Sequence, residues 1–170
     1  MSLHFFSAAF RPADEAERQQ AVRGIAPIAA DDAALRDVLE ETCRILRTPI
    51  AMLTLTDGDV QRMVGVVGMP AIEVPRAIAF CSHTIATTEG LLTIPDLRAD
   101  PRFAANPLVC GGPRARHYTG VAVRIGPFPV GALCGIDTRP HGPASFRQRA
   151  DLRRLAELAA RRLRADAPPN

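Results

Sequence analysis

The chain has 170 residues, 47% of them hydrophobic, which suits one globular domain with its own core. Its net charge is +3, from 21 basic and 18 acidic residues, and every basic residue is arginine. So small an excess lacks the concentrated basic field that nucleic-acid binding needs, and no apolar run reaches the roughly 20 residues that span a bilayer. We therefore expect a cytoplasmic protein that binds neither nucleic acid nor membranes.

Three segments are predicted along the chain. Residues 1–24 form an N-terminal arm or helix, in which 11–23 is predicted as a polar helix or arm. Residues 25–165 form the domain, and residues 166–170 (DAPPN) form a disordered tail. The domain opens with a helix that Asp31 or Asp32 caps, because apolar residues then recur at helical spacing from Leu35. Pro49 ends this helix.

A β-hairpin follows the first helix of the domain. Residues 50–56 and 60–67 are strand-like, and Asp57-Gly58 between them is a strong turn signal. A short helix then begins at Phe80, with Ser82 or the preceding turn as its cap, and Gly90 ends it. Residues 91–94 form a brief strand.

The segment 96–117 contains three prolines and two glycines, so it cannot be one regular element. A crossover this long inside a compact domain is usually functional. Residues 118–125 and 130–136 form a second hairpin. A final helix starts with the capping box formed by Ser145 and Gln148, and its apolar stripe consists of Leu152, Leu155, Ala159 and Leu163.

This order of elements predicts an α+β fold with an antiparallel sheet of about five strands. The four cysteines lie at positions 43, 81, 110 and 134 without a C-x-x-C pair, which predicts free thiols and no metal site.

Five short motifs, in this order, resemble the GAF domain, a small-molecule-binding sensory module of bacterial signalling proteins. They are FCSHTI from Phe80, IPDL from Ile94, DPRF with NPLV between Asp100 and Val109, YTG from Tyr118, and GALCGID from Gly131. The resemblance implies a profilin- or PAS-related sheet of five to six strands. The terminal helices would cover one face, and the short helix and crossover would roof a ligand cavity on the other.

On this resemblance, nine residues are expected to line the cavity. They come from the short helix, the crossover and the strand after it: Cys81, His83, Thr84, Arg102, Phe103, Asn106, Val109, Tyr118 and Val121. The ligand is not predicted, and no catalytic or metal-binding residue is assigned. The resemblance further implies a homodimer through the terminal helices, for which the stripe of Leu152, Leu155 and Leu163 is the expected interface, and an output kinase or cyclase as partner.

The predicted function is a stand-alone or excised GAF sensor domain that binds a small molecule and signals through its terminal helices. One alternative is a thiol-dependent enzyme like free methionine sulfoxide reductase, in which Cys81 and Cys110 would approach each other. Another is a ligand-free module for dimerisation or partner binding. A bilin photoreceptor is disfavoured because Ser82 separates Cys81 from His83, and cyclic-nucleotide binding is disfavoured because the chain has no lysine.

Overall fold

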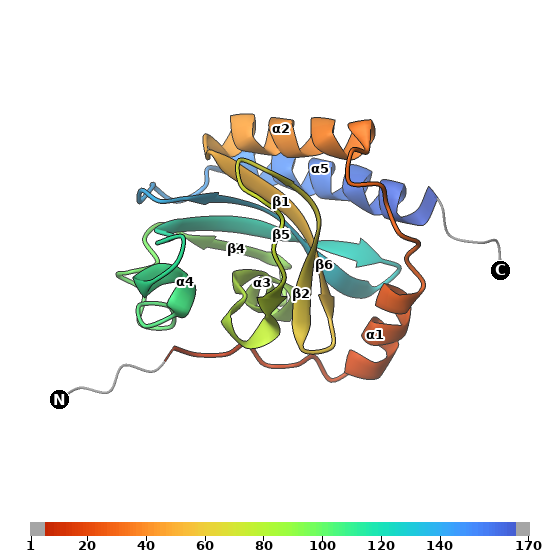
Figure 1. Cartoon of the computed structure of the whole chain (residues 1–170), viewed down its shortest axis with the longest axis horizontal. Helices are drawn as coiled ribbons and strands as arrows, with labels where there is room; N and C mark the ends of the chain where they lie inside the picture. Colours follow the sequence, from red (N-terminus) through yellow and green to blue (C-terminus); the bar gives the residue numbers. More distant parts are fainter. Residues whose placement is uncertain (1–5, 166–170) are drawn as a thin grey trace.

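A single antiparallel sheet of six strands organises the computed structural model, which describes residues 6–165 (Figure 1). The strand order across the sheet is β3-β2-β1-β6-β5-β4. The strands are β1 (Ile50–Asp57), β2 (Val60–Val67), β3 (Val74–Pro75), β4 (Leu91–Ile94), β5 (His117–Ile125) and β6 (Phe128–Asp137). The expected α+β fold with an antiparallel sheet is thus confirmed, with the short edge strand β3 in addition to the five strands expected from the order of elements.

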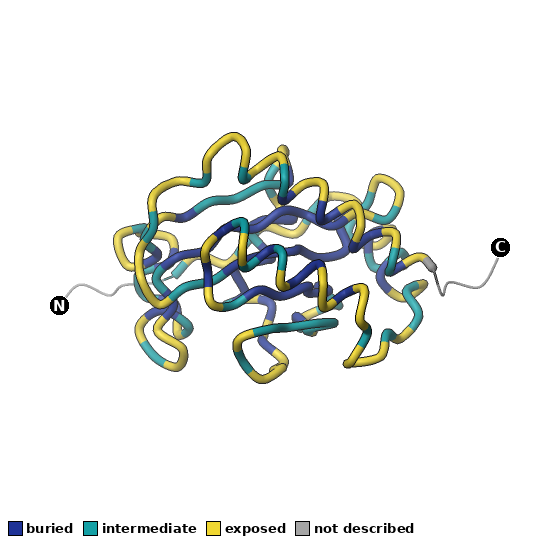
Figure 2. The backbone as a smooth tube through the Cα atoms, turned by 90° about the horizontal axis from the view of Figure 1, so that it is seen from above, coloured by how far each residue is buried: buried dark blue, intermediate teal, exposed yellow. Residues whose placement is uncertain are grey.

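Both predicted hairpins are present. In the first, Asp57 pairs with Val60 around a turn in which Gly58 has φ 60°, a conformation that favours glycine. In the second, β5 and β6 pair from His117 opposite Asp137 to Ile125 opposite Phe128. Strands β1 and β6 lie side by side in the middle of the sheet, and most of their residues are buried. The tube view shows the buried backbone gathered in the interior of the molecule (Figure 2).

Two long helices cover one face of the sheet, which we call the helix side (Figure 1). They are α2 (Ala33–Leu46), whose first turn Asp32 caps by accepting a hydrogen bond from Leu35 N, and α5 (Phe146–Ala165). The capping box is confirmed, because Ser145 Oγ accepts from Gln148 N and Ser145 N donates to Gln148 Oε1.

The stripe on α5 packs against its own sheet. Leu152, Leu155 and Leu163 belong to one buried core with residues of α2, β1, β5 and β6. The expectation that these leucines form a dimer interface is therefore wrong, since they are already covered within the chain. An amphipathic stripe shows which face of a helix is buried, and here the domain's own sheet buries it.

Short elements cover the opposite face, which we call the roof side. They are the 3₁₀ turn η1 (Arg76–Ile78), α3 (Phe80–Ala86) and the single turn α4 (Pro107–Cys110) inside the crossover. A second buried core lies beneath them. Ser82 does not cap α3, because Ala79 is the residue before it; the Ser82 hydroxyl instead donates to Arg76 O, 3.1 Å away.

The N-terminal segment runs along the roof side to α1 (Glu15–Arg23), which contacts β1 and β6 (Figure 1). Ser7 N donates to Arg102 O at the start of this path, and Val22 of α1 is buried in the helix-side core. The helix expected within residues 11–23 is therefore confirmed. The predicted boundary at residue 24 stays a prediction, and the predicted tail at 166–170 lies outside the described residues.

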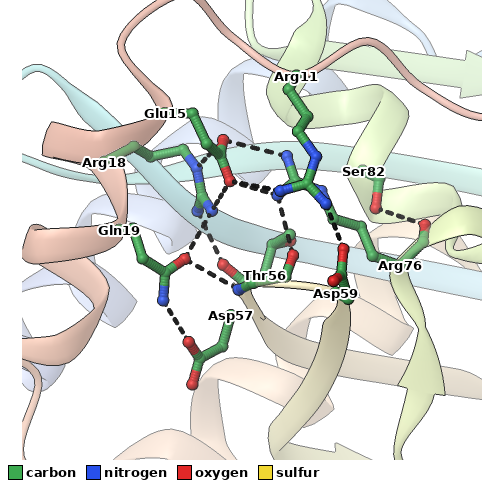
Figure 3. A network of polar contacts seen from close by, with 10 residues as sticks. Arg11, Glu15, Arg18, Gln19, Thr56, Asp57, Asp59, Arg76 and Ser82 are labelled. Atoms are coloured by element: carbon green, nitrogen blue, oxygen red, sulfur yellow. Dashed lines mark hydrogen bonds and ion pairs between the residues drawn. The ribbon is translucent and has the colours of Figure 1, made fainter.

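A polar network fixes α1 to the sheet (Figure 3). The fully buried guanidinium of Arg18 donates to both carboxylate oxygens of Glu15 and, over 2.8 Å, to Thr56 O. Arg76 also donates to the carboxylate of Glu15. Burial acts to raise the pKa of Glu15, but the hydrogen bonds and charges of the two arginines outweigh it and lower this pKa to about 2.

Candidate functional site on the roof side

Most of the nine expected site residues lie together on the roof side, but they form a packed core. Tyr118 is 0% exposed, and its hydroxyl is 2.5 Å from Thr84 Oγ1. The ring of Phe80 meets those of Phe103 and Tyr118 edge-on, with centroids 5.8 and 5.6 Å away. The hydroxyl groups and rings of these side chains therefore make their contacts with one another.

His83 and Arg102 lie at the outer edge of this core. The His83 ring packs edge-on against Phe103, with centroids 4.7 Å apart, and burial, assisted by the positive charge of Arg102, lowers the His83 pKa. Arg102 donates to both oxygens of Asp100 and lies over the ring of Phe103. Its guanidinium thus has a carboxylate partner within the same turn.

Asn106 and Val109 hold the crossover in shape. The Asn106 side chain caps α4 by accepting from Leu108 N, and its amide donates to Ile78 O, which ties the crossover to η1. Val109 is buried in the roof-side core. Both positions were expected at the cavity, and in the structure their contacts are with the protein itself.

Val121 lies on the other face of the sheet. Side chains alternate along a strand, so Tyr118 on β5 faces the roof while Val121, three residues later, faces α5 and belongs to the helix-side core. The expectation that Val121 lines the cavity is therefore wrong, because the alternation of side chains along β5 turns Val121 to the opposite face of the sheet.

The thiol of Cys81 meets Cys134, not Cys110. The two sulfur atoms, from α3 and β6, are 3.7 Å apart and buried, whereas Cys110 is exposed and donates to Ala105 O and Asn106 O. The hydrogen bond from Cys134, joined by Thr54 and Tyr118, lowers the pKa of Cys81 in spite of burial. The same pair raises the pKa of Cys134, so Cys81 is the more easily ionised thiol.

An apolar pocket opens beside this core, between the roof and the β3-β2-β1 edge of the sheet. Its floor includes Met52 and Met63, its roof includes Phe80 and Cys81, and Ile72, which is 43% exposed, lies at its rim. The space free for a water-sized sphere is ≈ 40 Å³. The other lining residues are Ile50, Gln61, Met69, Val74, Leu108, Pro113, Ala115 and Ile136.

Of the nine expected site residues, Cys81 alone lines this pocket. Sequence reasoning missed the β1–β2 contribution because it followed the family motifs, which begin at Phe80. A signal was present: three of the four methionines, at 52, 63 and 69, all line the pocket. A polar Gln61 in a strand-like run that is apolar apart from Gln61 and Arg62 was a second signal.

Residues 6–165 contain neither a cluster of metal-ligating side chains nor a membrane-spanning helix. No group of three His, Cys, Asp or Glu side chains is placed to hold a metal ion. No helix there combines the length and the apolar character that a membrane crossing requires.

The fold and the pocket define a class of protein: a small α+β domain with two long helices on one face of the sheet and a roofed apolar pocket on the other. A family model for the GAF domain matches residues 32–163. The chain therefore belongs to the GAF domain family.

Several known proteins are similar to this chain. The chain is 33% identical over 155 residues to a cyclic di-GMP phosphodiesterase of Pseudomonas aeruginosa, covering 89% of this chain and 26% of that protein. A GAF/HD domain protein from Geobacter sulfurreducens superposes with a TM-score of 0.61 at 15% identity, over 81% of this chain and 95% of that one. A type II free methionine-R-sulfoxide reductase from Thermoplasma acidophilum superposes with a TM-score of 0.57 at 16% identity, over 77% of this chain and 95% of that one. The chain thus spans about a quarter of the length of the curated relative, and the two structural likenesses show the fold alone.

Proposed function

We propose that this chain is a sensory GAF module that binds a small molecule in the apolar pocket and passes the event to an output partner. The observation that carries the proposal is the pocket itself. It lies on the side of the sheet away from the α2 and α5 pair, so its occupancy changes the contacts of the roof. A ligand that prefers one arrangement of the roof shifts the population of that arrangement.

A continuous path leads from the pocket to the N-terminal helix. Cys81 lines the pocket on α3, and its neighbour Ser82 donates to Arg76 O. The side chain of Arg76 then bonds Glu15 on α1. A shift of α3 therefore acts on α1 through two consecutive contacts, Ser82 with Arg76 and Arg76 with Glu15, which gives the proposed signal a physical route.

The output that we propose is a domain of cyclic di-GMP signalling. The support is the name of the Pseudomonas aeruginosa relative, which is a cyclic di-GMP phosphodiesterase of which this chain corresponds to about a quarter. The earlier expectation of a kinase or cyclase partner remains a second form of the same idea. In either form the chain acts as a regulatory module in the cytoplasm, and the output partner performs the catalysis.

Mass spectrometry of the freshly purified protein tests the binding function. Under native conditions we expect an excess mass that disappears on denaturation, because the ligand is not covalently held. The matched control is Ile72→Trp, which fills the rim of the pocket at a half-exposed position and should abolish the excess mass without unfolding the domain. A protein without excess mass that no small molecule stabilises against heat would overturn the proposal.

One observation favours a second candidate, thiol chemistry. The sulfur atoms of Cys81 and Cys134 are 3.7 Å apart, and Cys81 also borders the pocket. In such a reaction the Cys81 thiolate attacks a sulfoxide sulfur, and the sulfoxide oxygen takes up the two protons that the thiols release and leaves as water. Cys134 then attacks the Cys81 sulfur, which closes a disulfide and releases the thioether product. An added dithiol must then reduce the disulfide.

Turnover of free methionine sulfoxide with a dithiol reductant tests this second candidate. Cys81→Ser and Cys134→Ser should each abolish turnover, whereas Cys110→Ser, the exposed control, should leave it unchanged. If the wild-type protein shows no turnover, or if the Cys81 variant retains it, the enzymatic reading fails.

A further inference from the structure

The pocket contains one polar group whose hydrogen bonding is incomplete. Gln61 lies on β2, opposite Thr56 of β1 and Val74 of β3, and its side chain lines the pocket while only 4% exposed. Its Oε1 atom is buried and accepts no hydrogen bond from any residue between 6 and 165. Buried carbonyl oxygens are normally hydrogen-bonded, so this acceptor is available to a donor group that a bound molecule supplies.

We infer that the pocket takes a small, neutral, largely apolar molecule that carries one hydroxyl donor, such as a phenol or short alcohol, and that Gln61 Oε1 accepts its hydrogen bond. This inference rests on the proposed function and names the ligand class for the same site. Its basis is the juxtaposition of one unpaired amide oxygen with an otherwise apolar lining.

The lining also defines what the ligand is not. None of the lining residues is charged, so a phosphate or carboxylate would enter without a counter-ion and would lose its hydration. Gln61 is the one lining residue with a side-chain oxygen or nitrogen, and the Cys81 sulfur is already in contact with Cys134. The site therefore offers one directional contact and selects otherwise by shape and apolarity.

The size of the ligand follows from the methionines. The free space of ≈ 40 Å³ holds only a few atoms as the side chains now lie. Met52, Met63 and Met69 line it, and unbranched thioether side chains can change rotamer to admit a ring. Met63 is restrained because its sulfur accepts from Ile72 N at the rim, so admission of a ring should move Met52 and Met69 most.

Phenol and toluene form the matched pair of probes, since they share size and shape and differ in the hydroxyl donor. Affinities for both are measured by titration, with methyl-labelled methionine followed by NMR to locate binding at Met52, Met63 and Met69. In Gln61→Leu we expect the ratio of phenol to toluene affinity to fall about tenfold relative to the wild type. Comparing ratios cancels the different hydration of the two probes.

Gln20→Leu makes the same chemical change at an exposed position of α1 and should leave the ratio unchanged. If Gln61→Leu does not fold, Gln61→Met keeps the length of the side chain and serves in its place. An unchanged ratio in the Gln61 variant, or no methionine shift with either probe in the wild type, would overturn the ligand class. The sensory function would still stand if the purified protein carried another molecule whose retention did not depend on Gln61.

Discussion

The two sides of the sheet are covered by different kinds of element and held by different kinds of contact. On the helix side, two long amphipathic helices bury continuous stripes, and the core that they form with the sheet is aliphatic apart from its sulfur-containing Cys43. On the roof side, short elements and a 22-residue crossover are held by specific polar contacts such as Thr84 with Tyr118 and Asn106 with Ile78. The helix side holds the aliphatic core, and the roof side, which holds the pocket, is where our proposal places the change that a ligand causes.

The largest effect is expected on the helix side, for Leu152→Ala. Leu152 is 0% exposed, so truncation removes buried methyl groups and leaves a cavity, which costs about 2–5 kcal/mol of unfolding free energy. Chemical denaturation followed by circular dichroism measures this loss. Leu158→Ala on the same helix is the control, because Leu158 is 40% exposed and should change stability by less than about 0.5 kcal/mol. Equal losses in the two variants would contradict the packing of α5.

On the roof side we expect a smaller loss, for Tyr118→Phe. The change leaves the Thr84 hydroxyl buried without its 2.5 Å partner and should cost about 1–2 kcal/mol. Adding Thr84→Val removes that unpaired hydroxyl, so the double variant should regain part of the loss. A double-mutant cycle by denaturation measures the coupling, and strictly additive losses would show that the two hydroxyls do not interact.

Arg102→Ala, expected from the family resemblance to weaken ligand binding, should now leave affinity unchanged, because Arg102 pairs with Asp100 at the surface.

The same contrast explains how far the sequence could be interpreted. Periodicity, caps and turns are local signals, and they predicted α2, both hairpins and α5. The family motifs located the roof but not the pocket, because the order of residues in a motif does not say which of them satisfy one another. Tyr118 is paired by Thr84, which comes 34 positions earlier, and Cys81 by Cys134, 53 positions later. Only the fold brings such partners together, and only the fold shows that Gln61 Oε1, in the pocket lining, has no partner among residues 6–165.

The smallest effect on stability is expected at Glu15, whose pairing with Arg76 attaches α1 to the roof side. The Glu15 pKa is about 2 in the folded protein, against 4.5 ordinarily, because Arg18 and Arg76 outweigh the effect of burial. A carboxylate with a lowered pKa stabilises the fold above about pH 4.5, and this contribution is lost as the pH falls from there towards 2. After allowance for solvent screening we expect it to be about 1 kcal/mol.

Glu15→Gln should remove that pH dependence, so the wild-type and variant stabilities should converge between pH 4.5 and 2. Denaturation at a series of pH values measures the convergence. Glu17→Gln is the control, because Glu17 is exposed on the same helix. Parallel curves for Glu15→Gln and the wild type would mean that Glu15 does not carry the attachment. Convergence would instead show that the pairing of Glu15 with Arg18 and Arg76, which includes the last step of the proposed route from the pocket, contributes measurable free energy to the fold.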